Sequence, residues 1–275
     1  WGPTNAKEAF PTAYLDDANW RKSLFIKTKN FINKTQLQFA TRVHKAVQKA
    51  SFVIAASTDS ANALKKYFQC NPILINESGC NVTNNNPVHN FEGKQTLELL
   101  WVGRFIFTKQ LKLALKSLAA CENKNIKLHI VGGSIEEEAP FKKLSEKLMI
   151  KEQCIWHEKI SHDKVQALMQ QCDLFFFTSI AEGTPHVILE AFNNSLPVLC
   201  FNTCGQGDCV NDKVGLKIEL SNPQQSIKDF TEKIEFLYNN RKELKRMSAN
   251  CKERQMELSW DNKIKQMIEL YTKIK

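Results

Sequence analysis

LELLWVG at residues 97–103 opens a regular series of apolar segments. KLHIVGG (127–133), DLFFFTS (173–179) and LPVLCF (196–201) follow it, and stretches with helical periodicity separate them. Segments that are apolar on both faces are typical of parallel strands covered by helices on each side. The series therefore predicts an α/β domain of the Rossmann-like type, with a parallel sheet between two layers of helices.

The chain before this series predicts a smaller unit. We expect irregular to weakly helical structure over 1–34, a helix over 35–50, a strand at 51–57, a short helix through Leu64 and Phe68, and a strand at 72–75. Residues 76–94 are rich in Asn, Gly and Pro and lack periodicity, so they predict a linker. Only one strand, helix, strand unit precedes the linker.

The net charge and the lengths of the apolar runs limit the partners that the protein can have. The 275 residues carry a net charge of +9, which favours anionic partners such as phosphates, acidic lipids or nucleic acid. No nucleic-acid-binding motif accompanies the charge, so we expect no nucleic-acid partner. No apolar run approaches the roughly 20 residues of a membrane span, although peripheral contact with the inner membrane face stays an open alternative.

The nine cysteines are scattered and mostly lie in apolar segments, as buried free thiols do. They indicate a reducing, cytoplasmic location. Cys200, Cys204 and Cys209 lie close together, but they lack the paired spacing of a zinc site. We therefore predict no bound metal.

Two glycine-containing strand ends are candidate ligand contacts, because ligands of doubly wound sheets bind beyond the carboxyl ends of strands. Gly103 and Arg104 follow the first strand, with Lys109 after a short loop, and two cations there suit a phosphate or diphosphate. An alternative is that both are ordinary surface cations. Gly132 and Gly133 end the next strand, where a nucleotide can lie against the backbone. The chain contains neither G-x-G-x-x-G nor a phosphate-binding loop, which disfavours dehydrogenase, kinase and ATPase functions.

TSIAEGTPHVILEAF (178–192) runs from a strand into a helix. We expect Thr184 to cap that helix and Pro185 to occupy its first turn. Glu190 follows His186 by one turn and stands among apolar residues, so it needs a polar partner. That partner is either a neighbouring backbone amide, which makes Glu190 structural, or the diol of a bound ribose.

The ordered set VGR(x4)K, IVGG, EGTPHVILEAF and LPVLCFNTCGQGDCVNDKVGL, over about 96–220, resembles the donor domain of the retaining GT-B glycosyltransferases called family 4, or glycosyl transferases group 1. A hallmark of this family is a pair of glutamates separated by seven residues, and Glu182 and Glu190 match it. The chain departs from the family at Gln110 and Ser195, which stand where glycine is usual. WGPTNAKEAFP (1–11) resembles a degraded glycine-rich stretch of some members.

The resemblance implies a role for each matched residue. Arg104, Lys109 and Glu182 are the implied catalytic residues, and the implied donor contacts are Gly103, Gly132, Gly183, Thr184, Pro185, His186, Val187 and Glu190. Arg104 and Lys109 would neutralise the leaving diphosphate without a metal, Glu182 would contact the donor sugar, and Glu190 would hold the ribose.

The resemblance also implies an organisation and a function. We expect a partial acceptor-side domain and linker over 1–90, joined by a C-terminal helix at 260–275, and a donor-binding domain over 91–259. About 90 residues are too few for a complete acceptor domain, so its first half is expected to be absent from this chain. The implied reaction moves a hexosyl group, with retention, from a nucleoside diphosphate sugar to a glycan or lipid-linked acceptor. The alternative is an inactive nucleotide-sugar-binding or scaffold protein.

Overall fold

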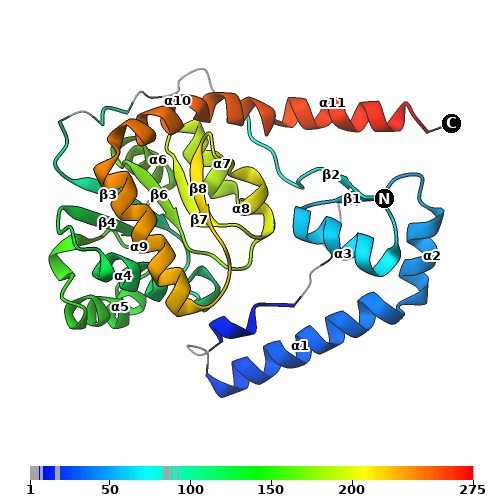
Figure 1. Ribbon diagram of the computed structural model, residues 1–275, viewed down its shortest axis with the longest axis horizontal. Helices are drawn as coiled ribbons and strands as arrows, with labels where there is room; N and C mark the ends of the chain where they lie inside the picture. Colours follow the sequence, from blue (N-terminus) through cyan, green and yellow to red (C-terminus); the bar gives the residue numbers. More distant parts are fainter. Residues whose placement is uncertain are drawn as a thin grey trace.

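The computed structural model describes residues 6, 9–15, 19–82, 87, 89–91 and 93–274. Most of the WGPTNAKEAFP segment, including Asn5 and Lys7, lies outside these ranges. The described chain forms an N-terminal unit, from α1 to β2, and a sheet domain, from β3 to α10 (Figure 1). The last helix, α11, extends from the sheet domain toward the N-terminal unit.

The elements alternate as expected through the sheet domain. In chain order they are η1 (Thr12–Tyr14), α1 (Trp20–Phe39), α2 (Thr41–Lys49), β1 (Ile54–Ala55), α3 (Thr58–Phe68), β2 (Ile73–Leu74), β3 (Leu97–Val102), η2 (Phe107–Lys109), α4 (Leu111–Ala120), β4 (Ile126–Val131), α5 (Ile135–Lys147), η3 (Lys151–Gln153), β5 (Cys154–Trp156), α6 (His162–Gln171), β6 (Leu174–Phe177), α7 (His186–Asn193), β7 (Val198–Phe201), α8 (Cys204–Cys209), β8 (Gly215–Ile218), α9 (Pro223–Asn239), α10 (Arg241–Glu257) and α11 (Trp260–Tyr271).

The six strands of the sheet domain are parallel, in the order β5-β4-β3-β6-β7-β8. This arrangement confirms the predicted α/β fold class. The chain builds the sheet outward in one direction from β3 and in the other from β6. The order of strands therefore reverses between β3 and β6, and crevices at such reversals are where ligands of these sheets bind.

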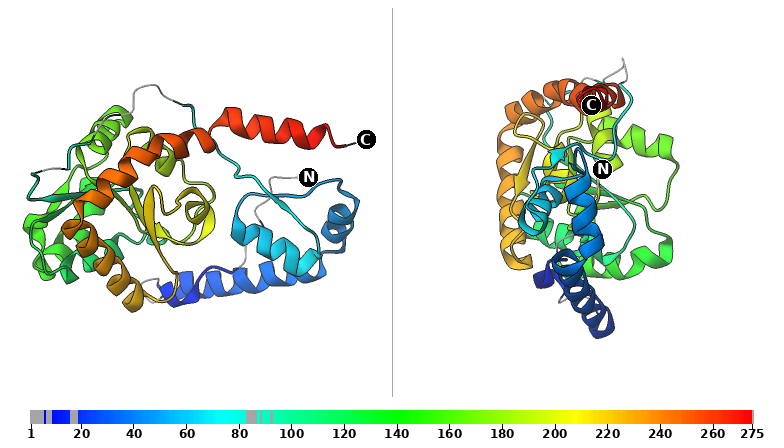
Figure 2. Two further views of the ribbon diagram at one scale, coloured as in Figure 1. Left: turned by 45° about the horizontal axis from the view of Figure 1, so that its top comes forward. Right: turned by 90° about the vertical axis from the view of Figure 1, so that its right-hand side faces the viewer.

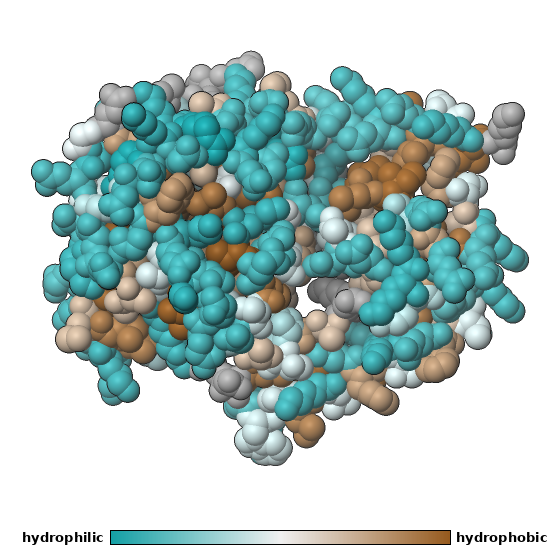
Figure 3. Space-filling view, viewed as in Figure 1, coloured by the Kyte–Doolittle hydropathy of each residue, from teal (hydrophilic) through white to brown (hydrophobic). Residues whose placement is uncertain are grey.

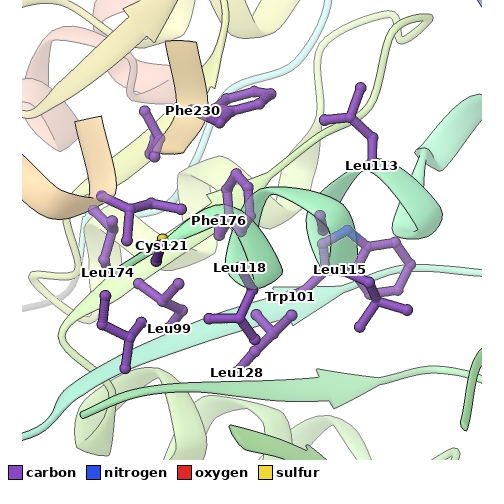
Figure 4. Packing of buried hydrophobic residues seen from close by; sticks show 14 of the residues in the cluster. Leu99, Trp101, Leu113, Leu115, Leu118, Cys121, Leu128, Leu174, Phe176 and Phe230 are labelled. Carbon is purple, nitrogen blue, oxygen red and sulfur yellow. The ribbon is translucent and has the colours of Figure 1, made fainter. Parts of the chain in front are cut away.

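Alternate side chains of each strand pack on opposite faces of the sheet. Leu99 and Trp101 of β3 and Phe176 of β6 face α4 and α9, where Phe230 contacts Phe176 (Figure 4). Leu100 of β3 joins the cluster on the other face, with α6, α7 and the end of α10. Both faces are thus covered, which explains why the strands are almost continuously apolar.

The N-terminal unit is held by a smaller core. β1 and β2 pair in parallel over two residues each, and α3 packs against them through Leu64 and Phe68. The short helix expected through these residues is confirmed. The strands expected at 51–57 and 72–75 are present but much shorter, because no further strand in the described chain extends their pairing.

The second half of 1–34, expected to be irregular to weakly helical, is a regular helix, since α1 begins at Trp20. The Asn19 side chain accepts a hydrogen bond from Lys22 N (2.8 Å) and caps the helix. The apolar residues of α1 spread around the helix, so no helical periodicity reveals it. The single helix expected over 35–50 is wrong, because Ala40 leaves the helical conformation and separates α1 from α2.

The chain crosses between the two parts at several places. Tyr14, from the segment before α1, is buried in the sheet domain, where its hydroxyl lies 2.6 Å from Ser226 Oγ and its ring meets Phe201 edge-on. α1 then runs along the lower edge of the molecule toward α2 and α3 (Figures 1 and 2). At the opposite edge, the Lys263 ammonium of α11 donates to the Asn76 carbonyl (2.9 Å) in the linker.

No helix among the described residues has both the length and the apolar character needed to cross a bilayer. All nine cysteines are free thiols. Burial raises the pKa of the Cys121, Cys154 and Cys209 thiols to about 12, so these side chains pack as small apolar groups.

The two departures from the family's glycines fall where glycine's conformational freedom matters. Gln110 has φ 55° and Ser195 has φ 54°, both in the left-handed region. We predict that Ser195→Gly raises the free energy of unfolding by about 1 kcal/mol, because a side chain costs roughly that much in this conformation. Urea denaturation followed by circular dichroism measures it.

Ser195→Ala is the matched control, since alanine keeps the strained backbone while removing the hydroxyl. We expect no gain from it. An equal gain from both variants would assign the effect to the buried Ser195 hydroxyl instead of the backbone.

Candidate functional site

The predicted catalytic side chains meet at the point where the strand order reverses. Lys109 ends η2, which follows β3, and Glu182 lies on the loop that follows β6. The Lys109 ammonium and the Glu182 carboxylate form an ion pair. The pair joins the carboxyl ends of β3 and β6 across the crevice.

Surrounding groups fix this ion pair. Ser179 Oγ donates to Glu182 Oε1 (2.6 Å), and the Lys109 ammonium lies 5.3 Å from the centre of the Phe177 ring. The two charged side chains are 16% and 18% exposed. Because they are largely withdrawn from water, their charges act more strongly on a nearby ligand than surface charges would.

The ends of β3 and β4 lie against each other beside Lys109. Gly132 has φ +123°, and a Cβ atom there would overlap the carbonyl group of Gly103. Glycine at this position therefore permits both the turn and the close approach of two backbones. Arg104 is exposed, and within the described ranges its guanidinium has no ion-pair partner. The two predicted cations thus differ: Lys109 is paired, and Arg104 is available to a ligand.

The loop before α7 is covered by the linker. Glu77 Oε1 accepts a hydrogen bond from Thr184 N (3.2 Å), and Ser78 Oγ lies 3.1 Å from His186 Nε2. The Glu77 carboxylate thus accepts from a backbone amide just before α7, where the helix dipole favours negative charge. Gly183 contacts the same carboxylate, because a Cβ atom there would overlap Glu77 Oε1.

The expected capping of α7 is wrong. Pro185, in extended conformation, is the N-cap, and no side chain caps the helix. The Thr184 backbone amide bonds to Glu77, and the Thr184 hydroxyl is buried with no hydrogen-bond partner among the described residues. Nearby, Gln206 Oε1 is also buried and unpaired, although Gln206 Nε2 donates to the Ser179 carbonyl (2.9 Å). Buried polar atoms without partners require an explanation, and a bound ligand is one.

Glu190 has the polar partners that its position demanded. Gln166 Nε2 of α6 donates to Glu190 Oε2 (3.1 Å), and His162 Nε2 lies 3.5 Å from Oε1. The partners within the protein are therefore side chains of α6, not the neighbouring backbone amide that was one alternative, and contact with a ribose stays a prediction. The carboxylate is 31% exposed and remains open to a ligand. Val187, also predicted to contact the donor, is partly buried against the α7 face of the sheet.

α3 and α8 exchange carboxylate caps across the cleft. Asp59 of α3 accepts from the Cys204 amide (2.7 Å), which begins α8. In return, Asp208 of α8 accepts from the Thr58 amide (2.8 Å), which begins α3. Each acid thus lies at the positive end of the other helix, and the two caps hold the N-terminal unit against the sheet domain.

Metal ligands do not gather around these residues. Across the described ranges, no group of three or more His, Cys, Asp or Glu side chains is arranged to hold a metal ion. Cys200 and Cys209 are fully buried, and burial raises the pKa of both thiols.

A family model for glycosyl transferases group 1 matches residues 82–254, more than half of the chain. The chain belongs to this family. The match spans the whole sheet domain up to α10, including the ends of β3, β4 and β6 described above. No curated protein sequence matches the chain.

Solved structures share the GT-B fold of this group 1 chain at low sequence identity. The galactosyltransferase WaaB of the lipopolysaccharide outer core is 20% identical with a TM-score of 0.69, over 82% of this chain and 63% of that one. Sucrose-phosphate synthase from Thermosynechococcus elongatus is 18% identical with a TM-score of 0.68, over 97% and 66%. The pneumococcal O-GlcNAc transferase GtfA is 16% identical with a TM-score of 0.61, over 82% and 46%. The chain thus spans about half to two thirds of these proteins.

Sequence reasoning missed the residues that support the site. Glu77 and Ser78 come from the linker, about a hundred positions before the loop that they contact. Gln166 and His162 lie on another helix from Glu190. Contacts between distant segments have no spacing signal, whereas Ser179, three residues before Glu182, could have been found by inspecting the same loop.

We predict that Gly205→Ala costs about 2 to 3 kcal/mol of the free energy of unfolding. A Cβ atom at Gly205 would overlap the Gly183 carbonyl and the Thr184 backbone, which cannot move without displacing the loop. Gly183→Ala should cost less than about 1 kcal/mol, because the overlapping atom belongs to the flexible Glu77 side chain. Thermal denaturation compares the two, and equal losses would contradict this account of the loop.

Proposed function

We propose that this chain binds a nucleoside diphosphate sugar at the carboxyl ends of β3, β4 and β6. In this proposal it transfers a hexosyl group, with retention at the anomeric carbon, to a glycan or lipid-linked acceptor. The observation that carries the proposal is the Lys109–Glu182 ion pair, which spans the reversal of strand order in a group 1 glycosyltransferase fold. Pneumococcal GtfA, of similar fold, was solved with UDP and GlcNAc, which makes UDP the first nucleotide to test.

The diphosphate is assigned to Arg104, Lys109 and the amides before α7. Arg104 has no ion-pair partner in the described chain, and Lys109 lies five positions further along, at the end of η2 and next to Gly103. Both would neutralise charge on the departing diphosphate, which removes the need for a metal ion. Gly103 and Gly132, whose backbones lie against each other, would form the surface on which the nucleotide lies, and Gly183, Thr184 and Pro185 would border the phosphates and sugar.

The two glutamates take different parts of the donor. Glu182, at the crevice, would accept hydrogen bonds from donor-sugar hydroxyls. Glu190, partly exposed one turn into α7, would accept from the ribose diol and exchange Gln166 or His162 for it. His186 and Val187, in the first turn of α7, would position the donor.

The bond changes are those of a front-face substitution. The acceptor hydroxyl oxygen bonds to the anomeric carbon as the bond from that carbon to the diphosphate breaks. The hydroxyl proton leaves with the diphosphate. Retention follows because the acceptor arrives on the face that the diphosphate leaves, and no enzyme nucleophile is assigned.

An inactive nucleotide-sugar-binding or scaffold protein is the second candidate. It is favoured by the small two-stranded sheet of the N-terminal unit, in which each strand has two residues. The proposed domain limits, 1–90 with 260–275 and 91–259, and a cytoplasmic location with peripheral contact at the inner membrane face stay predictions. Donor binding is common to both candidates, and sugar transfer separates them.

We predict that one of UDP, GDP or ADP binds the chain, and that Arg104→Ala and Glu190→Ala each weaken binding by at least about tenfold. The first variant loses a charge-assisted contact to phosphate, and the second loses the ribose contact. Isothermal titration calorimetry measures the dissociation constants.

Lys252→Ala and Glu269→Ala are charge-matched controls on exposed helix positions, and they should change the affinity less than twofold. If no nucleotide binds a folded sample, the transferase proposal is wrong for this chain. If both controls weaken binding as much as the site variants, the site is wrongly placed.

Glu77→Gln should tighten binding of the same nucleotide by about threefold or more. The substitution removes a negative charge beside the proposed diphosphate, while the glutamine carbonyl can still accept from Thr184 N. Glu152→Gln, on the exposed surface of η3, is the control for loss of one charge. Weaker binding by Glu77→Gln would mean that the Glu77 carboxylate helps to hold the donor.

A further inference from the structure

A cavity of about 560 Å³ lies beside Glu182, between the sheet domain and the N-terminal part of the chain up to the first turn of α3. Phe107, Thr108 and residues 180–182 line one side, and α1 lines the other. Figure 3 shows the molecular surface hollowed between the two parts. The volume lies within the range of small-molecule sites. Because the cavity adjoins Glu182, it lies where an acceptor would meet the donor sugar.

One face of α1 forms the wall opposite Glu182. Its lining side chains recur at helical spacing: Lys22, Phe25, Ile26, Lys29, Asn30 and Asn33. The sequence of α1, Trp20–Phe39, contains no Asp or Glu. The wall therefore presents two ammonium groups with no acid on their own helix to neutralise them.

The acids of the cavity are already engaged elsewhere. Asp59 accepts from the Cys204 amide (2.7 Å) and the Thr203 hydroxyl (3.1 Å). Glu182 is paired with Lys109. Among the described residues, neither acid forms an ion pair with Lys22 or Lys29, so the two ammonium groups are not neutralised by the acids that line the cavity.

Aromatic rings lie next to the cations. The Phe10 and Phe107 rings have centres 5.3 Å apart, and the Lys22 ammonium lies 4.4 Å from the centre of the Phe107 ring. Asn30 fixes Phe10 by accepting from its amide (2.8 Å) and donating to its carbonyl (2.9 Å). A cavity with apolar rings and a few fixed polar groups suits a ligand with a ring face and a charged substituent.

We propose that the acceptor is an anionic saccharide, whose carboxylate or phosphodiester group is held by Lys22 and Lys29. Its reacting hydroxyl lies toward Glu182, and its sugar ring packs against Phe10 and Phe107. This inference rests on the proposed transferase function and adds the chemical class of its acceptor. The anionic group takes no part in the bond changes, since it only positions the hydroxyl that attacks the anomeric carbon.

The test measures binding of three probes by calorimetry at low salt, with the chain saturated with the nucleotide that it binds. The probes are tetragalacturonate, a glycerol phosphate tetramer and neutral maltotetraose. We expect one or both anionic probes to bind, maltotetraose to bind at least about tenfold more weakly, and added salt to reduce the anionic affinity. The tighter anionic probe identifies the source as a uronate or a phosphodiester.

Lys22→Gln/Lys29→Gln should weaken the anionic probe at least about tenfold. Lys45→Gln/Lys49→Gln removes the same charge from exposed positions of α2 and should have less than about a twofold effect. Nucleotide affinity should be unchanged in both double variants. Equal losses in the two double variants, equal binding of maltotetraose, or no binding of any probe to nucleotide-bound chain would overturn the acceptor assignment. Absence of nucleotide binding in the unmodified chain would instead refute the proposed function.

Discussion

The ion pair between Lys109 and Glu182 is the contact on which the site depends. It connects the segments after β3 and β6, the two strands at which the chain reverses its direction across the sheet. Ser179 and Phe177 hold the pair in a largely buried position. The packing of both sheet faces fixes where these strands end. The position of the charged pair therefore depends on the apolar core.

The N-terminal unit is held against the sheet domain by polar contacts more than by a shared apolar core. The exchange of caps between Asp59 and Asp208, and the bond from Glu77 to Thr184, all place a carboxylate at the amino end of a helix. Such contacts are weaker and more dependent on salt than apolar packing, so they suit a cleft that opens to admit a ligand and closes on it. Glu77 differs from the other two acids, because it accepts from the Thr184 amide, which the proposed function assigns to the donor.

The sheet domain could be predicted well from the sequence, because its strands and the residues that follow them are recognisable from short local patterns. The strands are predominantly apolar segments, and the glycines and charged residues of the site lie a few positions after the strand ends. The N-terminal unit was harder to predict, since α1 lacks a single apolar face. Within the sheet domain, the helix α8 gave no signal, because two glycines in six residues give it weak helical propensity. The support of Glu190 by α6, and of the α7 loop by Glu77, depends on distant pairs that no local pattern encodes.

The most direct test of the account is to map the backbone amides that respond to UDP, or to whichever nucleotide binds, by NMR. The account predicts that the largest chemical-shift changes fall at Gly103, Gly132, Gly183 and Thr184, at the ends of β3, β4 and β6. Saturable binding that leaves these amides unchanged and shifts others would contradict the placement of the site at the reversal of strand order.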